Sequence, residues 1–140
     1  MGLILDSSVL IAAERLGQSV RQVLKRVQAA HGELRCALSV VSVVELTHGI
    51  HRAKNLADRA RRQAFCDELL RDTAVLPVTV EIAQIAGRID GEQAAHGVSI
   101  AFEDLLIGAT ALSFGYSVVT LNVAHFRLIP VRGSTLGRFR

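Results

Sequence analysis

Short apolar runs alternate along the chain with longer segments in which apolar residues recur every three or four positions. The runs are typical of buried strands and the periodic segments of helices that pack by one face. Strands are predicted at about residues 2–5, 34–38, 75–78, 117–121 and 128–131. Helices are predicted at about residues 7–16, 19–31, 42–49, 56–72, 79–95 and 102–114. This alternation predicts an α/β fold: a central, mostly parallel sheet of four to five short strands flanked by helices.

Local signals set the limits of several helices. Gly17, Gly32 and Gly115 each follow a periodic segment and predict a helix end. Ser42 and Glu45 have the spacing of a capping box, although the valines around them favour a strand. We therefore expect a helix to begin at about Ser42.

The whole chain is interpreted as one domain with a short tail. Its 140 residues suit a single core, and there is no internal repeat or linker. Pro130 restricts the last strand to an edge of the sheet. We expect the domain to span residues 1–131, and residues 132–140 to form a basic C-terminal tail that frays.

Composition excludes several classes of protein. Half of the residues are hydrophobic, which argues against disorder. No apolar run approaches the ~18 residues of a membrane span, and the first residues form no signal peptide, so we expect a cytoplasmic location. Cys36 and Cys66 match no metal motif and are expected to be small buried hydrophobic residues.

The charge of the chain is mildly basic, with a formal net charge of +3 and a pI of about 9.4. Fourteen of the sixteen cations are Arg, whose planar group suits phosphate, although GC-rich genomes favour Arg as well. Arg52, Lys54, Arg59, Arg61 and Arg62 form one basic cluster. It can bind an RNA backbone or be a solvated helix face, and both interpretations stay open.

Four polar residues are predicted to meet at one edge of the sheet. Asp6 directly follows the first predicted strand, and Asn122 directly follows the fourth. Glu45 lies in the first turn of the predicted helix that follows the second strand, and Asp104 lies in the first turn of the predicted helix at residues 102–114. Ligands of open α/β sheets bind beyond the carboxyl ends of the strands. The topology therefore predicts that these side chains converge there.

Three clustered carboxylates imply a cation. At ~4 Å each pair repels by about 1 to 4 kcal/mol, so without a cation one acid tends to stay protonated. A hard divalent ion such as Mg²⁺ or Mn²⁺ suits an all-oxygen site better than Zn²⁺. Such an ion activates water and neutralises charge on a phosphodiester, which makes phosphodiester hydrolysis the natural chemistry.

Each candidate also has a purely structural interpretation. Asp6 can cap the following helix, and Glu45 can complete a capping box. Glu103 and Asp104 can favour the positive end of a helix dipole, and Asn122 can be an ordinary turn residue.

Four segments in order resemble the motifs of PIN-domain nucleases. They are Ile4–Ile11, Ser42–Gly49, Phe102–Ala111 and Thr120–Pro130, the last with a His-Phe pair. Each motif alone is weak, but their order and spacing cover the chain from Gly2 to about Pro130.

Within that family the chain is similar to the VapC toxins of bacterial toxin–antitoxin pairs. The resemblance implies a single PIN-like domain and an endoribonuclease that cuts a structured cellular RNA and slows translation. It also implies Mg²⁺ or Mn²⁺, a homodimer, a cognate antitoxin that occludes the site, and products with 5′-phosphate and 3′-hydroxyl ends.

The resemblance assigns roles by position. Asp6, Glu45 and Asp104 become catalytic metal ligands, directly or through water. Asn122 stands where many relatives have a fourth acid. Its amide can still bind a metal ion or a metal-bound water. The amide carries no negative charge, however, and this puts a second tightly held metal in doubt. Glu103 is a rival ligand, because adjacent helix positions point about 100° apart, and the motif selects Asp104.

Three hydroxyls are candidate supporting residues. Ser7 and Ser8 can hold Asp6 or a metal-bound water, and Thr120 can do the same for Asn122; all three can equally be ordinary turn and strand-end residues.

Other interpretations fail on named residues or remain as alternatives. A haloacid-dehalogenase-type phosphatase needs a second Asp where Ser8 stands, and a response-regulator receiver needs a late lysine, whereas Lys25 and Lys54 are early. The histidines match no common zinc spacing. A catalytically silent PIN domain that binds RNA or protein, and a non-toxic RNA-processing nuclease, remain open.

Overall fold

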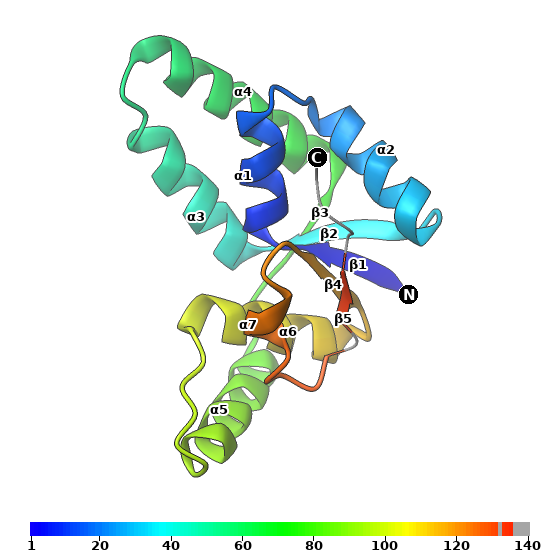
Figure 1. Ribbon diagram of the computed structural model, residues 1–140, viewed down its shortest axis with the longest axis vertical. Helices are drawn as coiled ribbons and strands as arrows, with labels where there is room; N and C mark the ends of the chain where they lie inside the picture. The colour runs from blue at the N-terminus through cyan, green and yellow to red at the C-terminus, as the bar shows by residue number, and fades with distance from the viewer. Residues whose placement is uncertain (132, 136–140) are drawn as a thin grey trace.

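The computed structural model describes residues 1–131 and 133–135 and has twelve elements (Figure 1). The strands are β1 (Gly2–Leu5), β2 (Arg35–Ser39), β3 (Ala74–Leu76), β4 (Ser117–Thr120) and β5 (Gly133–Thr135). The helices are α1 (Ser7–Arg15), α2 (Val20–His31), α3 (Val40–His51), α4 (Leu56–Asp72), α5 (Val80–Ala94), α6 (Phe102–Phe114) and α7 (Val123–Phe126).

The five strands form one sheet in the order β3-β2-β1-β4-β5, and every neighbouring pair is parallel. From β1 the chain builds outward through β2 to β3, then returns to the other side of β1 as β4. The strand order therefore reverses between β1 and β4, which is where open α/β sheets hold their ligands. The α/β prediction is confirmed.

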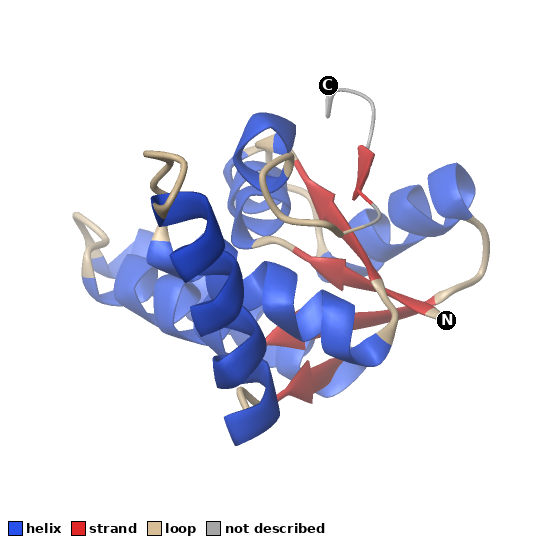
Figure 2. Cartoon of the chain, turned by 90° about the horizontal axis from the view of Figure 1, so that it is seen from below, coloured by secondary structure: helices blue, strands red, loops and turns tan. Residues whose placement is uncertain are grey.

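Helices cover both faces of the sheet. In Figures 1 and 2, α1 to α4 lie on one side, and α5 and α6 on the other. Alternation along β1 serves both layers: Leu3 and Leu5 belong to the cluster under α1 to α4, and Ile4 to the cluster under α5 and α6. A strand buried on both faces has to be apolar throughout, which explains its sequence.

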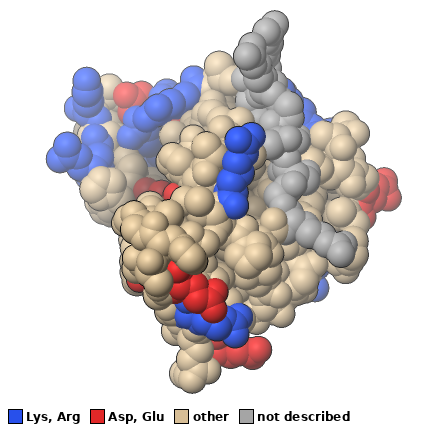
Figure 3. Space-filling view, turned by 60° about the horizontal axis from the view of Figure 1, so that its bottom comes forward, with Lys and Arg blue, Asp and Glu red and all other residues tan. Residues whose placement is uncertain are grey.

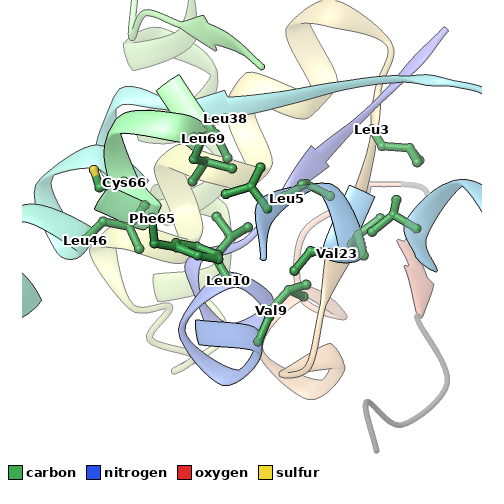
Figure 4. Packing of buried hydrophobic residues seen from close by; sticks show 14 of the residues in the cluster. Leu3, Leu5, Val9, Leu10, Val23, Leu38, Leu46, Phe65, Cys66 and Leu69 are labelled. Carbon is green, nitrogen blue, oxygen red and sulfur yellow. The ribbon is translucent and has the colours of Figure 1, made fainter. Parts of the chain in front are cut away.

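Figure 4 shows the first of these clusters, in which Leu5 and Leu38 of the sheet meet Leu10 of α1 and Leu69 of α4. Cys66 packs in the same cluster, as expected for a small buried residue.

The predicted start of α3 is wrong. The helix begins at Val40, and Ser39, the last residue of β2, caps it by accepting a hydrogen bond from the Val41 N–H. Ser42 is fully buried inside the helix, and Glu45 lies in the second turn instead of the first. The Ser39 cap at the strand end starts the helix, and Ser42, Leu46 and Ile50 are its buried residues, so the helix forms despite the strand propensity of the valines.

The predicted strand at residues 128–131 is also wrong. Residues 127–130 form a turn, and the edge strand is β5, paired in parallel with β4. The sheet thus continues into the segment that we expected to be a basic tail, and the limit between domain and tail stays a prediction. Residues 132 and 136–140 of that segment lie outside the described residues.

Other helix limits agree with the sequence. Ser19 and Gln22 form a capping box for α2, and Thr79 caps α5. Gly115 ends α6 with a φ of 68°, a conformation that favours glycine. In the part of the chain that is described, no helix is long and apolar enough to cross a membrane.

Gly108 allows α6 to approach the turn after α7. A Cβ at Gly108 would lie 2.8 Å from Cδ1 and 2.9 Å from Cγ2 of buried Ile129. We expect Gly108→Ala to destabilise the fold by about 1–3 kcal/mol in urea unfolding, because the packed side chain has to move.

Gly87→Ala in α5 is the matched control. A Cβ there meets nothing within 4 Å, so the variant is expected to gain about 0.5–1 kcal/mol from helix propensity alone. Equal stability of Gly108→Ala and the wild type would contradict this account of the α6 packing.

Candidate active site

Asp6 is a buried carboxylate at the carboxyl end of β1, with only 4% of its surface exposed. It stands at the N-cap position of α1 but makes no cap hydrogen bond. Instead its Oδ2 accepts hydrogen bonds from Ser8 Oγ at 2.7 Å and Thr120 Oγ1 at 2.8 Å. The interpretation of Asp6 as a simple helix cap is therefore wrong.

The two hydroxyls are themselves held by the backbone after β4. The Leu121 N–H donates to Ser8 Oγ at 3.1 Å, and the Asn122 N–H donates to Thr120 Oγ1 at 2.9 Å. A hydroxyl has one proton to donate and lone pairs to accept with. Because the lone pairs receive these N–H groups, the protons remain for Asp6, which joins the ends of β1 and β4.

Glu45 projects from the second turn of α3 toward α1, where its Oε2 accepts a hydrogen bond from Ser7 Oγ at 3.0 Å. Burial raises the pKa of Glu45, the Ser7 hydrogen bond lowers it, and the charges of Asp6, Glu103 and Asp104 raise it further. Ser7 thus supports Glu45, whereas we expected it to support Asp6 or a water.

Asp104 lies in the first turn of α6, with its Oδ2 at 3.2 Å from Nδ1 of His125 on α7. Burial is the main cause that raises the pKa of Asp104; the charge of Asp6 also raises it, and His125 acts in the opposite direction. The three acids therefore share one electrostatic site, although they come from three separate elements.

Asn122 differs from the other candidates. It is exposed, and at the N-cap position of α7 its side chain makes no cap hydrogen bond. Its backbone N–H donates to Thr120 Oγ1, and its carbonyl accepts a hydrogen bond from the His125 N–H at 3.0 Å. Its predicted metal contact stays a prediction, and Thr120 supports Asp6 as well as the Asn122 backbone.

A hollow of about 650 Å³ opens beside the acids, between α1, α3 and α4. We call it the α1–α3–α4 hollow, and its lining includes Ile11, Val44, Leu46 and Phe65 as apolar residues, Arg15, Arg52 and Arg62 as cations, Gly49, and the acids Glu45 and Glu103. In Figure 3, Lys and Arg gather toward the side on which α3 and α4 lie.

The structure divides the predicted basic cluster. Arg61 is engaged by Glu14 at 3.1 Å and Asp58 at 2.9 Å, so its charge is already neutralised by neighbours. Arg62 donates to the Gly49 carbonyl and lines the α1–α3–α4 hollow together with Arg52. Only part of the cluster therefore faces the side of the acids.

Two residues at the site had other roles in the sequence-based prediction. Glu103 was the rejected rival of Asp104, yet its charge acts on both Glu45 and Asp104. His125 was only part of a motif, yet it pairs with Asp104. The first-turn position of Glu103 was a signal for its contribution; nothing in the spacing pointed to the His125 contact.

The acids are close enough to interact but do not converge on one point. Within residues 1–131 and 133–135, no group of three or more His, Cys, Asp or Glu side chains is arranged to hold a metal ion.

Comparison with known proteins identifies relatives along nearly the whole chain. The model of the PIN domain family matches residues 3–129. The chain is 34% identical to Ribonuclease VapC1 of Rickettsia felis over 92% of its own length and 91% of the relative. It is 31% identical to Ribonuclease VapC of Rickettsia bellii, over 93% and 92% of the two chains.

Solved structures agree with these matches. A chain of VapBC2 from Rickettsia felis, bound to a promoter DNA fragment, superposes with a TM-score of 0.84 at 20% identity, covering 98% of this chain and all of that one. A chain of VapBC-5 from Mycobacterium tuberculosis superposes with a TM-score of 0.72 at 28% identity over 97% of both chains.

The raised pKa of Glu45 predicts a pH-dependent cost to stability. The folded chain holds this proton more tightly than the unfolded chain, so stability falls as pH rises from the unfolded pKa of ~4.3 through the folded pKa. Without added metal, Glu45→Gln should melt a few degrees above the wild type at pH 7 and lose this advantage near pH 4. Gln keeps an acceptor for Ser7 Oγ.

Glu92→Gln, an exposed acid on α5, controls for the change in net charge and should melt like the wild type. A Glu45→Gln variant that is less stable than the wild type at pH 7 would argue against a desolvated, repelled carboxylate.

Proposed function

The chain belongs to the PIN domain family and, within it, to the VapC ribonucleases, and from this we propose that it is a metal-dependent endoribonuclease that acts as the toxin of a toxin–antitoxin pair. One observation of the structure carries the proposal: at the carboxyl edge of the sheet, hydroxyls orient the carboxylates of Asp6 and Glu45, and His125 pairs with Asp104. A buried acidic group of this kind is costly to a fold that does not use it.

The residues present fit a hard divalent cation. Carboxylate oxygens suit Mg²⁺ or Mn²⁺, and Mg²⁺ binds proteins through few carboxylates while keeping several waters, so acids that do not converge on one point can still hold it. Ser42 supports this fit: its fully buried Oγ has no partner among the described residues, and it lies on the same helix face as Glu45. Asp6, Glu45 and Asp104 would hold the ion, in part through water.

The chain's own side chains orient and transfer protons around the scissile phosphate. Ser8 and Thr120 fix the Asp6 carboxylate, and Ser7 fixes that of Glu45, so both acids are positioned before substrate arrives. Glu45 and Asp104, whose pKa values are raised, are suited to accept a proton from attacking water. A bound divalent ion would activate this water and offset negative charge on the phosphate.

The expected products of hydrolysis are those that the resemblance to PIN-domain nucleases implies. Water attacks phosphorus and the bond to the 3′ oxygen breaks, so one fragment carries a 5′-phosphate and the other a 3′-hydroxyl. Fragments ending in 2′,3′-cyclic phosphate would contradict this route, because they require the ribose 2′-hydroxyl as nucleophile. Because translation takes place in the cytoplasm, a substrate RNA that serves translation implies that the protein acts there.

The catalytically silent alternative is supported by one residue and opposed by three. Asn122 lacks the charge of a fourth acid, but Asp6, Glu45 and Asp104 are all present, and each has a polar partner that orients it.

We further propose that a cognate antitoxin and a second copy of the chain are its partners. The similar structures of Rickettsia felis and Mycobacterium tuberculosis are VapBC assemblies. The α1–α3–α4 hollow, with an apolar lining next to Glu45, suits an antitoxin segment that covers the acids. Toxicity rather than RNA processing is tested by growth on expression with and without this antitoxin.

Asp6→Asn is expected to remove RNA cleavage, by at least about 100-fold, because it neutralises the acid on which the hydroxyls are aligned. The assay is cleavage of total bacterial RNA by antitoxin-free protein with Mg²⁺, Mn²⁺ or EDTA. Discrete fragments should appear only with metal.

Asp72→Asn, at the exposed end of α4, serves as the matched control and should cleave like the wild type. Fragments that persist in EDTA or in Asp6→Asn would contradict the proposal. RNA binding without any cleavage would favour the silent alternative.

Gly49→Leu is expected to weaken binding of the antitoxin at least about tenfold while RNA cleavage persists. Gly49 lines the α1–α3–α4 hollow and a Cβ there meets nothing within 4 Å, so a larger side chain fills space that a partner needs. Gly49→Ala is the control and should bind normally. Equal binding by both variants, measured by calorimetry, would place the antitoxin elsewhere.

A further inference from the structure

Two cations lie at the end of the α1–α3–α4 hollow that is far from the sheet. Glu45 lines the hollow near the sheet, where its hydrogen bond with Ser7 joins the second turn of α3 to the start of α1. Arg15 is the last residue of α1, Arg52 directly follows α3, and both line the same hollow. Both helices lead away from the carboxyl edge of the sheet (Figure 1), so the two arginines lie at its far end.

Helix geometry gives the distance from the acids to these cations. Arg52 lies seven residues after Glu45, and Arg15 lies eight residues after Ser7. At 1.5 Å per residue, these separations are roughly 10–12 Å along the helix axes. A nucleic-acid strand carries a negative charge every few ångströms along its axis. A strand whose scissile phosphate lies at the acids therefore brings neighbouring phosphates within reach of both arginines.

Both arginines are free to bind an anion. Their side chains are exposed, and in the described part of the chain no side-chain hydrogen bond or salt bridge engages either of them. Glu14, an acid at the same end of the hollow, is already paired with Arg61 at 3.1 Å. Arg62 adds a third positive charge and is fixed by its 2.7 Å hydrogen bond to the Gly49 carbonyl. The far end of the hollow therefore suits a phosphodiester.

We propose that Arg15 and Arg52 form a phosphate-binding subsite that holds the backbone of the substrate RNA beside the bond that is cleaved. This inference rests on the proposed function, because it takes RNA as the substrate. Of the predicted basic cluster, Arg52 thus serves RNA binding, whereas Arg61 is neutralised within the protein. Contacts of this kind position a strand without reading its sequence.

The subsite lies at the rim of the hollow and leaves the interior to a protein segment. Both arginines are exposed, whereas Gly49 in the same hollow is half-buried. An antitoxin segment seated at Gly49 would lie against the path of the strand and exclude RNA from the acids. RNA that follows the rim also agrees with the expectation that Gly49→Leu still cleaves.

A purely structural role of the arginines makes a different prediction. Cations at the carboxyl ends of helices interact favourably with the helix dipole, and Arg15 and Arg52 lie at such ends. If this is their only role, neutral variants melt at a slightly lower temperature but bind RNA as the wild type does. RNA binding therefore separates the two roles.

The test is binding of fluorescein-labelled poly(U) to the full, antitoxin-free chain in EDTA, measured by fluorescence anisotropy. EDTA prevents metal-dependent cleavage and removes any contribution of a bound cation. Arg15→Gln and Arg52→Gln are each expected to bind about three- to tenfold more weakly than the wild type. The slope of log K against log [NaCl] should become shallower by about 0.7 for each phosphate contact that is lost.

Two further variants control for charge. Arg88→Gln removes the same charge from an exposed position on α5, which lies on the other face of the sheet (Figure 2), and should bind normally. Arg52→Lys keeps the positive charge and should keep the salt dependence of the wild type. Circular dichroism verifies that each variant is folded.

The outcomes distinguish failure of the subsite from failure of the proposed function. A wild type that cleaves RNA, together with Arg15→Gln and Arg52→Gln variants that bind poly(U) like Arg88→Gln, overturns the subsite alone. A wild type that does not bind poly(U) also overturns it, as do variants that lose affinity only for the antitoxin, because the arginines then serve the protein partner. If both variants bind poly(U) more weakly but the wild type cleaves no RNA with Mg²⁺, the RNA contact stands and the nuclease is overturned.

Discussion

The hydrogen bonds between Asp6 and the hydroxyls of Ser8 and Thr120 hold the carboxyl edge of the sheet together. They connect the end of β1 with the end of β4, at the point where the strand order reverses. Backbone N–H groups after β4 orient both hydroxyls, so the fold itself determines where the carboxylate points. The rest of the site is arranged around this fixed charge: Glu45 from α3 and Asp104 from α6 both respond to it electrostatically.

The acids that suit this edge of the sheet to bind a cation also lower the stability of the folded state. Burial and mutual repulsion raise the pKa of Glu45 and Asp104, so without a cation the folded state bears a cost that a neutral side chain would avoid. The buried hydroxyl of Ser42, for which the described part of the chain offers no hydrogen-bond partner, adds to that cost. Sites that depart from the rules of a stable core are often functional ones, and a cation would remove the repulsion among the acids.

The sequence predicted most of the fold, because the fold depends on local patterns, and its choice of the main acids stays a prediction. The apolar run of β1 and its terminal Asp6 lie side by side in the sequence. One error was local: α3 starts at Val40 because Ser39 caps it, and not at Ser42. The other depends on pairing within the sheet: the edge strand is β5 at Gly133–Thr135, which pairs with β4. The partners of the acids, such as His125 beside Asp104, depend on tertiary packing that spacing does not encode.

The central claim is that the carboxyl edge of the sheet is a divalent cation site. Anomalous diffraction from crystals of the antitoxin-free protein grown with Mn²⁺ tests it most directly, because manganese is located independently of activity. The account predicts an anomalous peak among the carboxylates of Asp6, Glu45 and Asp104, and no such peak in Asp6→Asn crystals. A wild-type crystal with no manganese at these carboxylates, or with manganese only elsewhere on the surface, would contradict it.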